Sequence, residues 1–211
     1  MSDKKLKVTV LSIKNKFDNF LKINLYKVAV EKHDGGTNLC ERLVMERGHA
    51  VGILAYDPKA DKVILINEFR SGILAAGDYP FTESLPAGGL AEGEKEIACA
   101  VRETEEETGL ELTNPKIIRK GDYVSPGGTS EKISIVFGLV AANKAGGIHG
   151  NLNENEDIKT VVLSSSEFIK RVKSGKINDM KTVLAGYWLA DNLDKIKKEY
   201  KSALKLKPKN I

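Results

Sequence analysis

Cysteine is scarce in this sequence of 211 residues: only Cys40 and Cys99 are present, and neither belongs to a CxxC pair. So few cysteines exclude a disulfide-rich scaffold and favour two reduced thiols in the cytoplasm, with a single disulfide left open. Long hydrophobic runs are also absent, since no apolar stretch approaches the roughly 18 residues of a membrane-spanning helix. Residues 1–5 lack the apolar core of a signal peptide. We therefore expect a cytoplasmic protein that makes no use of a membrane.

The sequence likewise contains no internal repeat and no low-complexity linker. Its length is sufficient for one sizeable core, and its 41% hydrophobic and 29% charged residues are ordinary for a globular protein. We expect a small β subdomain over residues 1–47, a main domain over 48–195 and a basic C-terminal tail over 196–211.

Charge is unevenly distributed along the chain, although the formal net charge is only +4. Residues 1–22 carry +4 and residues 192–211 carry +5, which leaves −5 for the middle of the chain. An acidic centre favours a metal site over a nucleic-acid groove, so we expect no nucleic-acid partner. The Lys-rich stretch 195–201 leaves open a contact with RNA or a membrane surface, but a solvated helix end is the favoured interpretation.

The middle of the chain concentrates carboxylates in one predicted loop and helix. Glu94 is followed by Glu103, Glu105, Glu106 and Glu107. A helix places Glu103, Glu106 and Glu107 on one face because they stand at i, i+3 and i+4, whereas Glu105 points to solvent. Like charges on one helix face are destabilising, and few basic residues lie nearby to offset them. A divalent cation is the expected counter-charge, since Mg²⁺ and Mn²⁺ prefer carboxylate oxygens.

Other residues of this predicted helix fit the same interpretation. Ile97, Ala98 and Val101 form an apolar stripe that we expect to pack against a sheet. Arg102 is placed to hold a neighbouring carboxylate through a bidentate pair. Gly109 stands where the end of a helix commonly needs a left-handed backbone.

Alternating or continuously apolar segments predict strands in the rest of the chain. They cover residues 7–11, 25–30, 39–47, 50–56, 62–69, 82–85, 117–123, 132–140 and 157–163. Two further helices are expected at 164–175 and 181–193, the first capped by Ser164 or one of the two serines after it. Polar loops are expected at 71–79 and 143–156.

Together these residues resemble the Nudix box. The matching positions are Gly88, Glu94, Arg102, Glu103, Glu106, Glu107, Gly109 and Leu110. Thr104 departs from the family, which usually has an aliphatic residue there, and its β-branched shape predicts a small packing loss with intact chemistry. The expected fold class is therefore α/β: a Nudix α/β/α sandwich of mixed sheets with a small N-terminal β subdomain.

Two downstream segments resemble one branch of that family. They are residues 125–131, Ser-Pro-Gly-Gly-Thr-Ser-Glu, and the stretch from Gly147-Ile148-His149-Gly150 to Glu154-Asn155-Glu156-Asp157. Both are similar to the ADP-ribose pyrophosphatase branch, and the resemblance spans roughly residues 20–190. It implies a homodimer, often with N-terminal strands exchanged between the subunits.

The resemblance also implies roles for individual residues. Metal ligation is expected from the backbone carbonyl of Ala87 and from the carboxylates of Glu103, Glu106, Glu107 and Glu156. Glu154, on a mobile loop, matches the general base. Substrate contacts, some supplied by the partner subunit, are expected from Phe20, Arg42, Arg47, Arg70, Gly89, Ser125 and Glu131. The expected cofactor is Mg²⁺, with Mn²⁺ as an alternative.

Some of these roles have alternatives. Glu106 or Glu107 is the alternative to Glu154 as the general base. Phe20 fits packing in a core or strand as well as it fits stacking on a base. Arg70, taken without the family, is equally well a surface charge at the end of a strand. His49 is interpreted as structural, because these hydrolases need no catalytic histidine.

The predicted reaction is metal-dependent hydrolysis of the pyrophosphate bond of ADP-ribose or a related nucleoside diphosphate sugar, which gives a nucleoside monophosphate and a sugar phosphate. A preference for GDP-mannose is a near alternative, because a motif does not fix contacts to the base and sugar. Hydrolysis of oxidised nucleoside triphosphates is disfavoured by the downstream segments. A catalytically inactive nucleotide-binding regulatory module should have lost carboxylates, whereas this sequence keeps them all. An RNA-binding or decapping role would rest on the Lys-rich ends alone.

Overall fold

A computed structural model describes residues 5–151 and 155–206 of the protein. The chain divides into two compact units. The first comprises the described residues up to His49 together with Asp122–Lys132, and the second comprises Ala50–Gly121 and the described residues from Ile133 onward. The first boundary thus lies two residues beyond the expected one, and the N-terminal unit takes a segment that we expected in the main domain.

The N-terminal unit is built on an antiparallel sheet of three strands in chain order. These are β1 (Val8–Asp18), β2 (Lys22–Glu31) and β3 (Thr37–Glu46). The segment 122–132 attaches to the end of β3 through backbone hydrogen bonds from Met45 N to Gly128 O at 2.9 Å and from Ser130 N to Met45 O at 3.1 Å. These bonds explain why a segment remote in sequence belongs to this unit.

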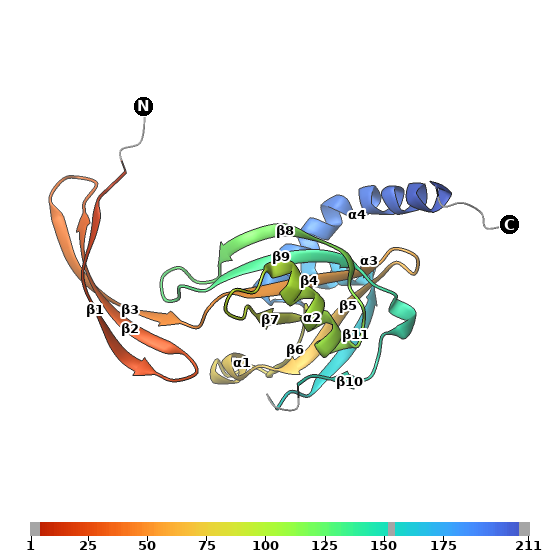
Figure 1. Cartoon of the computed structure of the whole chain (residues 1–211), viewed down its shortest axis with the longest axis horizontal. Coiled ribbons are helices and arrows are strands. Elements are labelled where there is room, and N and C mark those ends of the chain that lie inside the picture. Colours follow the sequence, from red (N-terminus) through yellow and green to blue (C-terminus); the bar gives the residue numbers. More distant parts are fainter. Residues whose placement is uncertain (1–4, 152–154, 207–211) are drawn as a thin grey trace. The chain divides into compact units, whose positions relative to one another are not determined.

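The second unit contains a mixed sheet. Its strands are β4 (Ala50–Asp57), β5 (Lys62–Phe69), β6 (Phe81–Ser84), β7 (Ala87–Gly89), β8 (Thr113–Tyr123), β9 (Lys132–Leu139), β10 (Ile148–His149) and β11 (Ile158–Ser164). They are arranged in the order β10-β11-β5-β4-β9-β8, with β6 paired to β5 and β7 paired to β4 (Figure 1). The central strand β4 runs parallel to β9 and antiparallel to β5 and β7.

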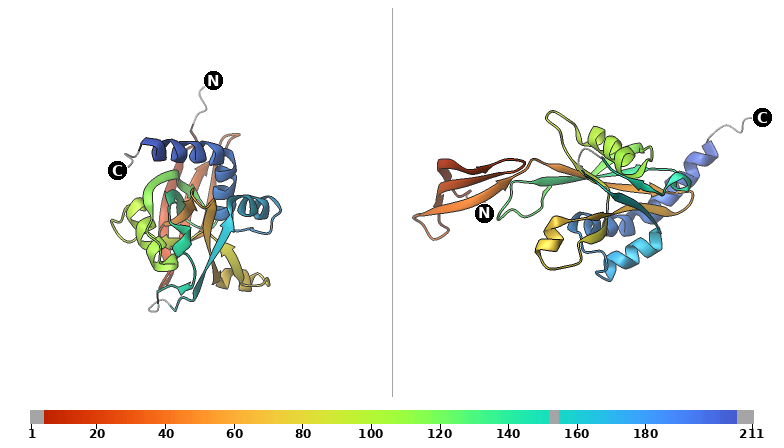
Figure 2. Two further views of the ribbon diagram at one scale, coloured as in Figure 1. Left: turned by 90° about the vertical axis from the view of Figure 1, so that its right-hand side faces the viewer. Right: turned by 90° about the horizontal axis from the view of Figure 1, so that it is seen from below.

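Helices cover both faces of this sheet. They are α1 (Ser71–Ala75), α2 (Glu96–Thr108), α3 (Ser165–Lys173) and α4 (Met180–Leu206), with a short 3₁₀ helix, η1 (Ala142–Lys144). The right-hand view of Figure 2 shows α2 on one side of the sheet, with α3 and the beginning of α4 on the other. The predicted α/β/α sandwich is therefore confirmed.

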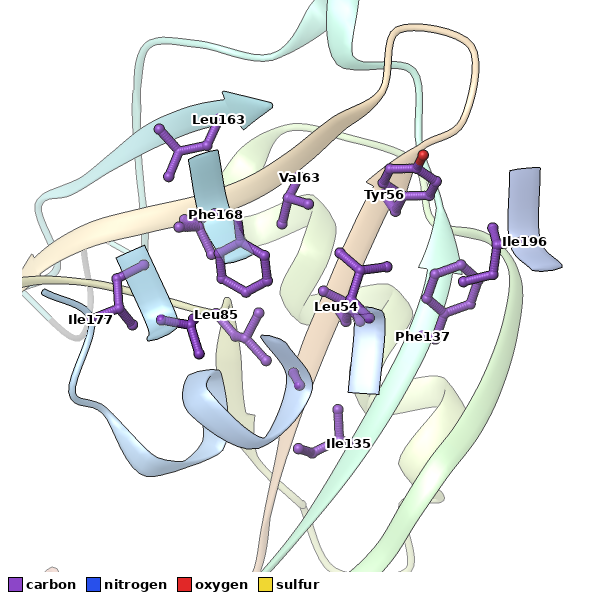
Figure 3. Packing of buried hydrophobic residues seen from close by; sticks show 14 residues of the cluster. Leu54, Tyr56, Val63, Leu85, Ile135, Phe137, Leu163, Phe168, Ile177 and Ile196 are labelled. Atoms are coloured by element: carbon purple, nitrogen blue, oxygen red, sulfur yellow. The ribbon is translucent and has the colours of Figure 1, made fainter. Parts of the chain in front are cut away.

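The alternation of side chains along β4 creates two separate cores. Val51 and Ile53 point to the α2 side, whereas Leu54 and Tyr56 point to the side of α3 and α4, because successive strand residues face opposite ways. On the latter side, Leu54 and Tyr56 pack with Phe168 of α3 among the buried residues (Figure 3). Burial on both faces explains why β4 reads as a continuous apolar run.

The predicted strands are present and both cysteines are reduced, whereas the apolar stripe of α2 is confirmed only in part. Ala98 is exposed, and Ile97 and Val101 are only half-buried at the margin of the core. The fully buried positions are instead Cys99 and Ala100, followed by charged and hydroxyl side chains. Both cysteines are free thiols.

Other elements differ in length, and the short elements β7, η1 and β10 were not predicted. Residues 71–75 form the short helix α1 inside the loop expected at 71–79, and α4 continues to Leu206, through most of the expected tail. The Ser164 hydroxyl accepts a hydrogen bond from Glu167 N at 3.1 Å, which confirms the predicted cap of α3. Within the residues that the structure describes, no helix is both long and apolar enough to span a membrane.

Candidate active site

Helix α2 presents the box carboxylates against the sheet. Gly109 ends the helix with a left-handed φ of 66°, as predicted, and its N–H donates to the carbonyl of Glu105. Thr104 is fully buried, and its hydroxyl donates to the carbonyl of Ala100 at 2.6 Å. The polar atom at the one position that departs from the box is therefore satisfied within the helix.

Arg102 ties the preceding loop to this helix. Its Nε and Nη2 donate to the two carboxylate oxygens of Glu94, each at 3.1 Å, which is the bidentate pair that the sequence predicted. Its Nη1 donates to Glu103 at 2.6 Å and to Glu106 at 3.1 Å, and its Nη2 also approaches the carbonyl of Gly89 at 3.3 Å. One guanidinium thus reduces the repulsion among three carboxylates and fixes the loop to α2.

Glu103 is a buried carboxylate, with only 9% of the residue exposed. Burial raises its pKa, while the hydrogen bond from Arg102 acts in the opposite direction. Its carboxylate occupies the space beside Gly88, where an added Cβ would lie 1.7 Å from Glu103 Oε1. Gly88 is therefore required because its lack of a side chain admits the carboxylate.

Glu107 is more deeply buried, with 3% of the residue exposed. The backbone N–H of Ala87 donates to Glu107 Oε2 at 2.8 Å, which joins α2 to β7. Burial raises the pKa of Glu107 to about 9, and the nearby charges of Glu103 and Glu68 add to the effect, although the Ala87 bond opposes it. Such a shift is typical of a functional site.

Glu68 belongs to the same carboxylate group but was missed in the sequence analysis. Alternate residues of β5 face α2, and along this face Ile64 and Ile66 are fully buried, whereas the next positions are Glu68 and Arg70. The Glu68 side chain is 14% exposed, and its Oε2 lies 2.7 Å from Arg70 Nη2. A charged pair at the end of an otherwise apolar strand face was the signal that could have revealed it.

Glu156 reaches the group from the loop that precedes β11. Burial raises the pKa of Glu68, and the Glu156 carboxylate raises it further, so the two side chains are electrostatic neighbours. The N–H of Asn151 donates to Glu156 Oε2 at 2.9 Å, and the N–H of Gly150 donates to the carbonyl of Glu106 at 3.2 Å. These bonds attach the base of the loop to α2. The predicted general base, Glu154, lies outside the described residues.

The N-terminal unit contains the other predicted substrate residues. Arg47 Nε lies 3.8 Å from Glu131 Oε1, so these two side chains are brought together. Arg42 is exposed and donates to the carbonyl of Glu41, and the carbonyl of Ser125 accepts hydrogen bonds within its turn. Phe20 is 89% exposed, which makes the alternative of core packing wrong for this side chain.

His49 makes a structural contact. Its Nδ1 accepts a hydrogen bond from the backbone N–H of Lys132 at 3.2 Å. The bond joins His49, the last residue of the first stretch of this unit, to Lys132, the last residue of its second stretch. This contact agrees with the structural interpretation of His49 and gives it no part in the carboxylate group.

The donor set of the carboxylate group fits a hard divalent cation. Glu103 and Glu107 are buried oxygen donors with raised pKa values, and the room beside Gly88 keeps the Glu103 carboxylate against β7. Among residues 5–151 and 155–206, no three Asp, Glu, His or Cys side chains are grouped closely enough to form a ready cation cage. Instead, Arg102 binds oxygens of Glu103 and Glu106.

The raised pKa of Glu107 predicts how the stability of the metal-free protein depends on pH. The unfolded chain releases this proton at an ordinary carboxyl pKa, whereas the folded state holds it until about pH 9. The free energy of unfolding in the presence of a chelator should therefore fall between about pH 5 and pH 9, by about 1.4 kcal/mol for each unit of pKa difference. Urea unfolding across this range measures the slope.

Two variants separate the contribution of Glu107 from that of other groups. Glu107→Gln should reduce the slope, because the variant has no proton to release at this position. Glu105→Gln should leave it unchanged, since Glu105 lies on the same helix but is exposed. Equal slopes in the wild type and Glu107→Gln would contradict the assignment.

Comparison with known proteins agrees with this geometry. The NUDIX domain model matches residues 46–181. A solved structure described as the crystal structure of an ADP compounds hydrolase superposes with a TM-score of 0.70, covering 92% of this chain and 98% of that chain. At 21% sequence identity, this likeness shows a shared fold.

Sequence relatives extend the match over most of the chain. The ADP-ribose pyrophosphatase of Escherichia coli strain K12 is 34% identical over 194 residues, which is 92% of this chain and 92% of that protein. The ADP-ribose pyrophosphatase of Haemophilus influenzae is 34% identical over 171 residues, which is 79% of this chain and 78% of that protein. The GDP-mannose pyrophosphatase of Shigella flexneri is 29% identical over 177 residues, which is 84% of this chain and 92% of that protein. The chain therefore belongs to the NUDIX family.

Proposed function

We propose that the protein hydrolyses the pyrophosphate bond of ADP-ribose or a related nucleoside diphosphate sugar and releases a nucleoside monophosphate and a sugar phosphate. The observation that carries the proposal is the burial of Glu103 and Glu107 on one face of α2, directly against the β7 backbone. A protein without a use for these charges would gain stability from apolar side chains there. The names of the sequence relatives support the substrate class.

The cofactor in this proposal is Mg²⁺ or Mn²⁺. The carboxylates of α2 and Glu156, with the carbonyl of Ala87, are the residues that would hold it. Such a cation neutralises charge on the diphosphate and lowers the pKa of a water molecule. The buried carboxylates would then be held as anions, because a nearby positive charge favours the ionised form.

The remaining steps belong to side chains of this chain. Glu154 removes the proton of the attacking water, and the exposed Glu106 is the rival for this role because it adjoins the same group. Arg70 pairs with the anionic diphosphate, because a guanidinium can donate two parallel hydrogen bonds to phosphate oxygens. Phe20, with its exposed ring, stacks on the base, and Arg42, Arg47, Gly89, Ser125 and Glu131 complete the substrate contacts.

GDP-mannose remains the second candidate substrate, because one of the similar proteins is named as its pyrophosphatase. The reaction at the carboxylates is the same for both substrates, so the choice depends on contacts to base and sugar. The inactive regulatory module is disfavoured because all box carboxylates are kept in place by specific contacts.

We also propose a homodimer that covers the N-terminal sheet. Residues paired across antiparallel strands point to the same face, and the pairs Val8 with Val30, Val10 with Val28 and Ile13 with Tyr26 make the β1–β2 part of one face apolar. On this face Val8 is 58% exposed and Val10 is 54% exposed. An exposed apolar patch of this kind is typical of a protein–protein interface.

The first prediction tests the function. With Mg²⁺, the protein should release nucleoside monophosphate from ADP-ribose, and a chelator should abolish the reaction. GDP-mannose, ADP-glucose, UDP-glucose and an oxidised deoxynucleoside triphosphate complete the panel. Glu103→Gln should lower kcat/KM by at least about 100-fold, whereas the exposed Glu105→Gln on the same helix should retain it. Absence of turnover on every compound would favour the inactive module.

The second prediction concerns the general base. Glu154→Gln should lower kcat by about 10²–10⁴-fold and leave the Mg²⁺ concentration for half-maximal rate nearly unchanged, because a base acts on the water rather than on the cation. Glu106→Gln is the comparison. A larger kcat loss in Glu106→Gln, again without a change in Mg²⁺ dependence, would transfer the role to Glu106.

The third prediction concerns the dimer. Light scattering should give twice the mass of one chain for the wild type. Val10→Glu should shift the protein to the monomer, because it places a charge on the apolar face, whereas Thr9→Glu, on the opposite face of the same strand, should remain a dimer. A wild-type monomer with full activity would refute the dimer.

A further inference from the structure

Glu68 and Arg70 form a close ion pair at the end of β5. Glu68 Oε2 and Arg70 Nη2 are 2.7 Å apart. Both atoms are buried, and neither makes a hydrogen bond with any described residue, so the ionic contact with each other is their polar partner. A buried charge separated from its partner is strongly unfavourable, so each side chain restricts the other.

The backbone of Arg70 is fixed on both sides. Its N–H donates to the carbonyl of Pro80 at 2.8 Å, and its own carbonyl accepts from Ile73 at 3.0 Å and Leu74 at 3.2 Å. Arg70 is also the residue that immediately precedes α1. With its backbone held in this way, the Arg70 side chain reaches Glu68 at ion-pair distance.

Other carboxylates surround the pair, so the contact with Glu68 decides where the Arg70 charge lies. The charges of both Arg70 and Glu68 act on Glu107, and that of Glu156 acts on Glu68, so the pair lies among the carboxylates described above. An arginine in this position is attracted to any of them. If it turned toward Glu107 or Glu156, it would compete with a cation for their oxygens.

We propose that Glu68 is a positioning residue that holds Arg70 away from the other carboxylates, with the free edge of its guanidinium available to the diphosphate of the substrate. The close contact with Glu68 is made by Nη2, and the Arg70 side chain is 34% exposed. The remaining N–H groups suffice for a bidentate contact with phosphate oxygens. This role rests on the proposed function, since it concerns the same site and the same substrate class.

The test separates binding of substrate from chemistry. Glu68→Gln should raise KM for ADP-ribose about 10-fold, about 1.4 kcal/mol, with kcat within about threefold of the wild type. The split is expected because a phosphate contact made before and during the reaction contributes uniform binding. The Mg²⁺ concentration for half-maximal rate should not change. A shifted Mg²⁺ dependence with unchanged KM would mean that Glu68 touches the cation and would overturn the proposal.

A double-mutant cycle tests whether Glu68 acts through Arg70. Arg70→Ala should raise KM at least as much as Glu68→Gln, and the double variant should be no worse than Arg70→Ala alone. Additive effects of the two substitutions would show independent roles and would overturn the proposal.

Glu83 supplies the matched control. It lies on the adjoining strand β6, and both of its carboxylate oxygens are 2.6 Å from Arg171 Nη1 of α3, on the other face of the sheet. Glu83→Gln should lower the melting temperature without changing KM. A similar rise of KM in this variant would attribute the effect of Glu68→Gln to general loosening of the strand pair and would overturn the proposal.

The wild-type protein distinguishes failure of the function from failure of this role. Turnover of ADP-ribose with an unchanged KM in Glu68→Gln would overturn the positioning role alone. If ADP-ribose is not turned over, calorimetric binding of ADP-ribose replaces KM as the measurement, and weaker binding to Glu68→Gln is again the expected result. Wild-type protein that neither hydrolyses nor binds ADP-ribose would overturn both.

Discussion

Burial of two carboxyl groups one helical turn apart is the constraint on which the rest of the site depends. Glu103 and Glu107 face the sheet where apolar side chains would be more stable, and both have raised pKa values because burial disfavours their charge. The structure offsets part of this cost locally. Arg102 binds Glu103, and the Ala87 N–H binds Glu107. The part of this cost that these contacts do not offset is the reason to expect a cation, since a group of buried anions is stable only with matching positive charge.

The same constraint explains where the sheet departs from an ordinary core. The α2 side of β5 is apolar as far as Ile66 and then becomes charged at Glu68 and Arg70, the residues that lie beside the buried carboxylates. Gly88 in β7 has no side chain for the related reason that the Glu103 carboxylate needs its space. At one end of the sheet, charged side chains therefore take positions that apolar side chains would otherwise fill. The middle of β4 and β5 is buried on both faces and contributes most to stability.

Local signals predicted much of this arrangement from the sequence. The box spacing predicted the helix of Glu103, Glu106 and Glu107, the bidentate contact of Arg102 and the left-handed end at Gly109, because each depends on residues within one or two turns. The expectation for Ile97, Ala98 and Val101 held only in part, because periodicity assumes that the apolar face is the buried one, and here part of the buried face is charged. Glu68 was missed because the charged pair that it forms with Arg70 at the end of an apolar strand face is a signal only of an unusual position, and the sequence does not show that this face of β5 is the α2 side of the sheet.

The division of the chain into two units separates the chemistry from most of the proposed recognition. The carboxylates, Ala87 and Arg70 lie in the second unit, whereas Phe20, Arg42, Arg47, Ser125 and Glu131 lie in the first. Relatives named for ADP-ribose and for GDP-mannose both align with this chain over most of its length. A pyrophosphate bond is common to both compounds, and so the carboxylate group has no reason to differ between them. Specificity for base and sugar is then expected to follow the N-terminal sheet and the segment 122–132, where a change of side chain leaves the buried carboxylates and their balance of charge undisturbed.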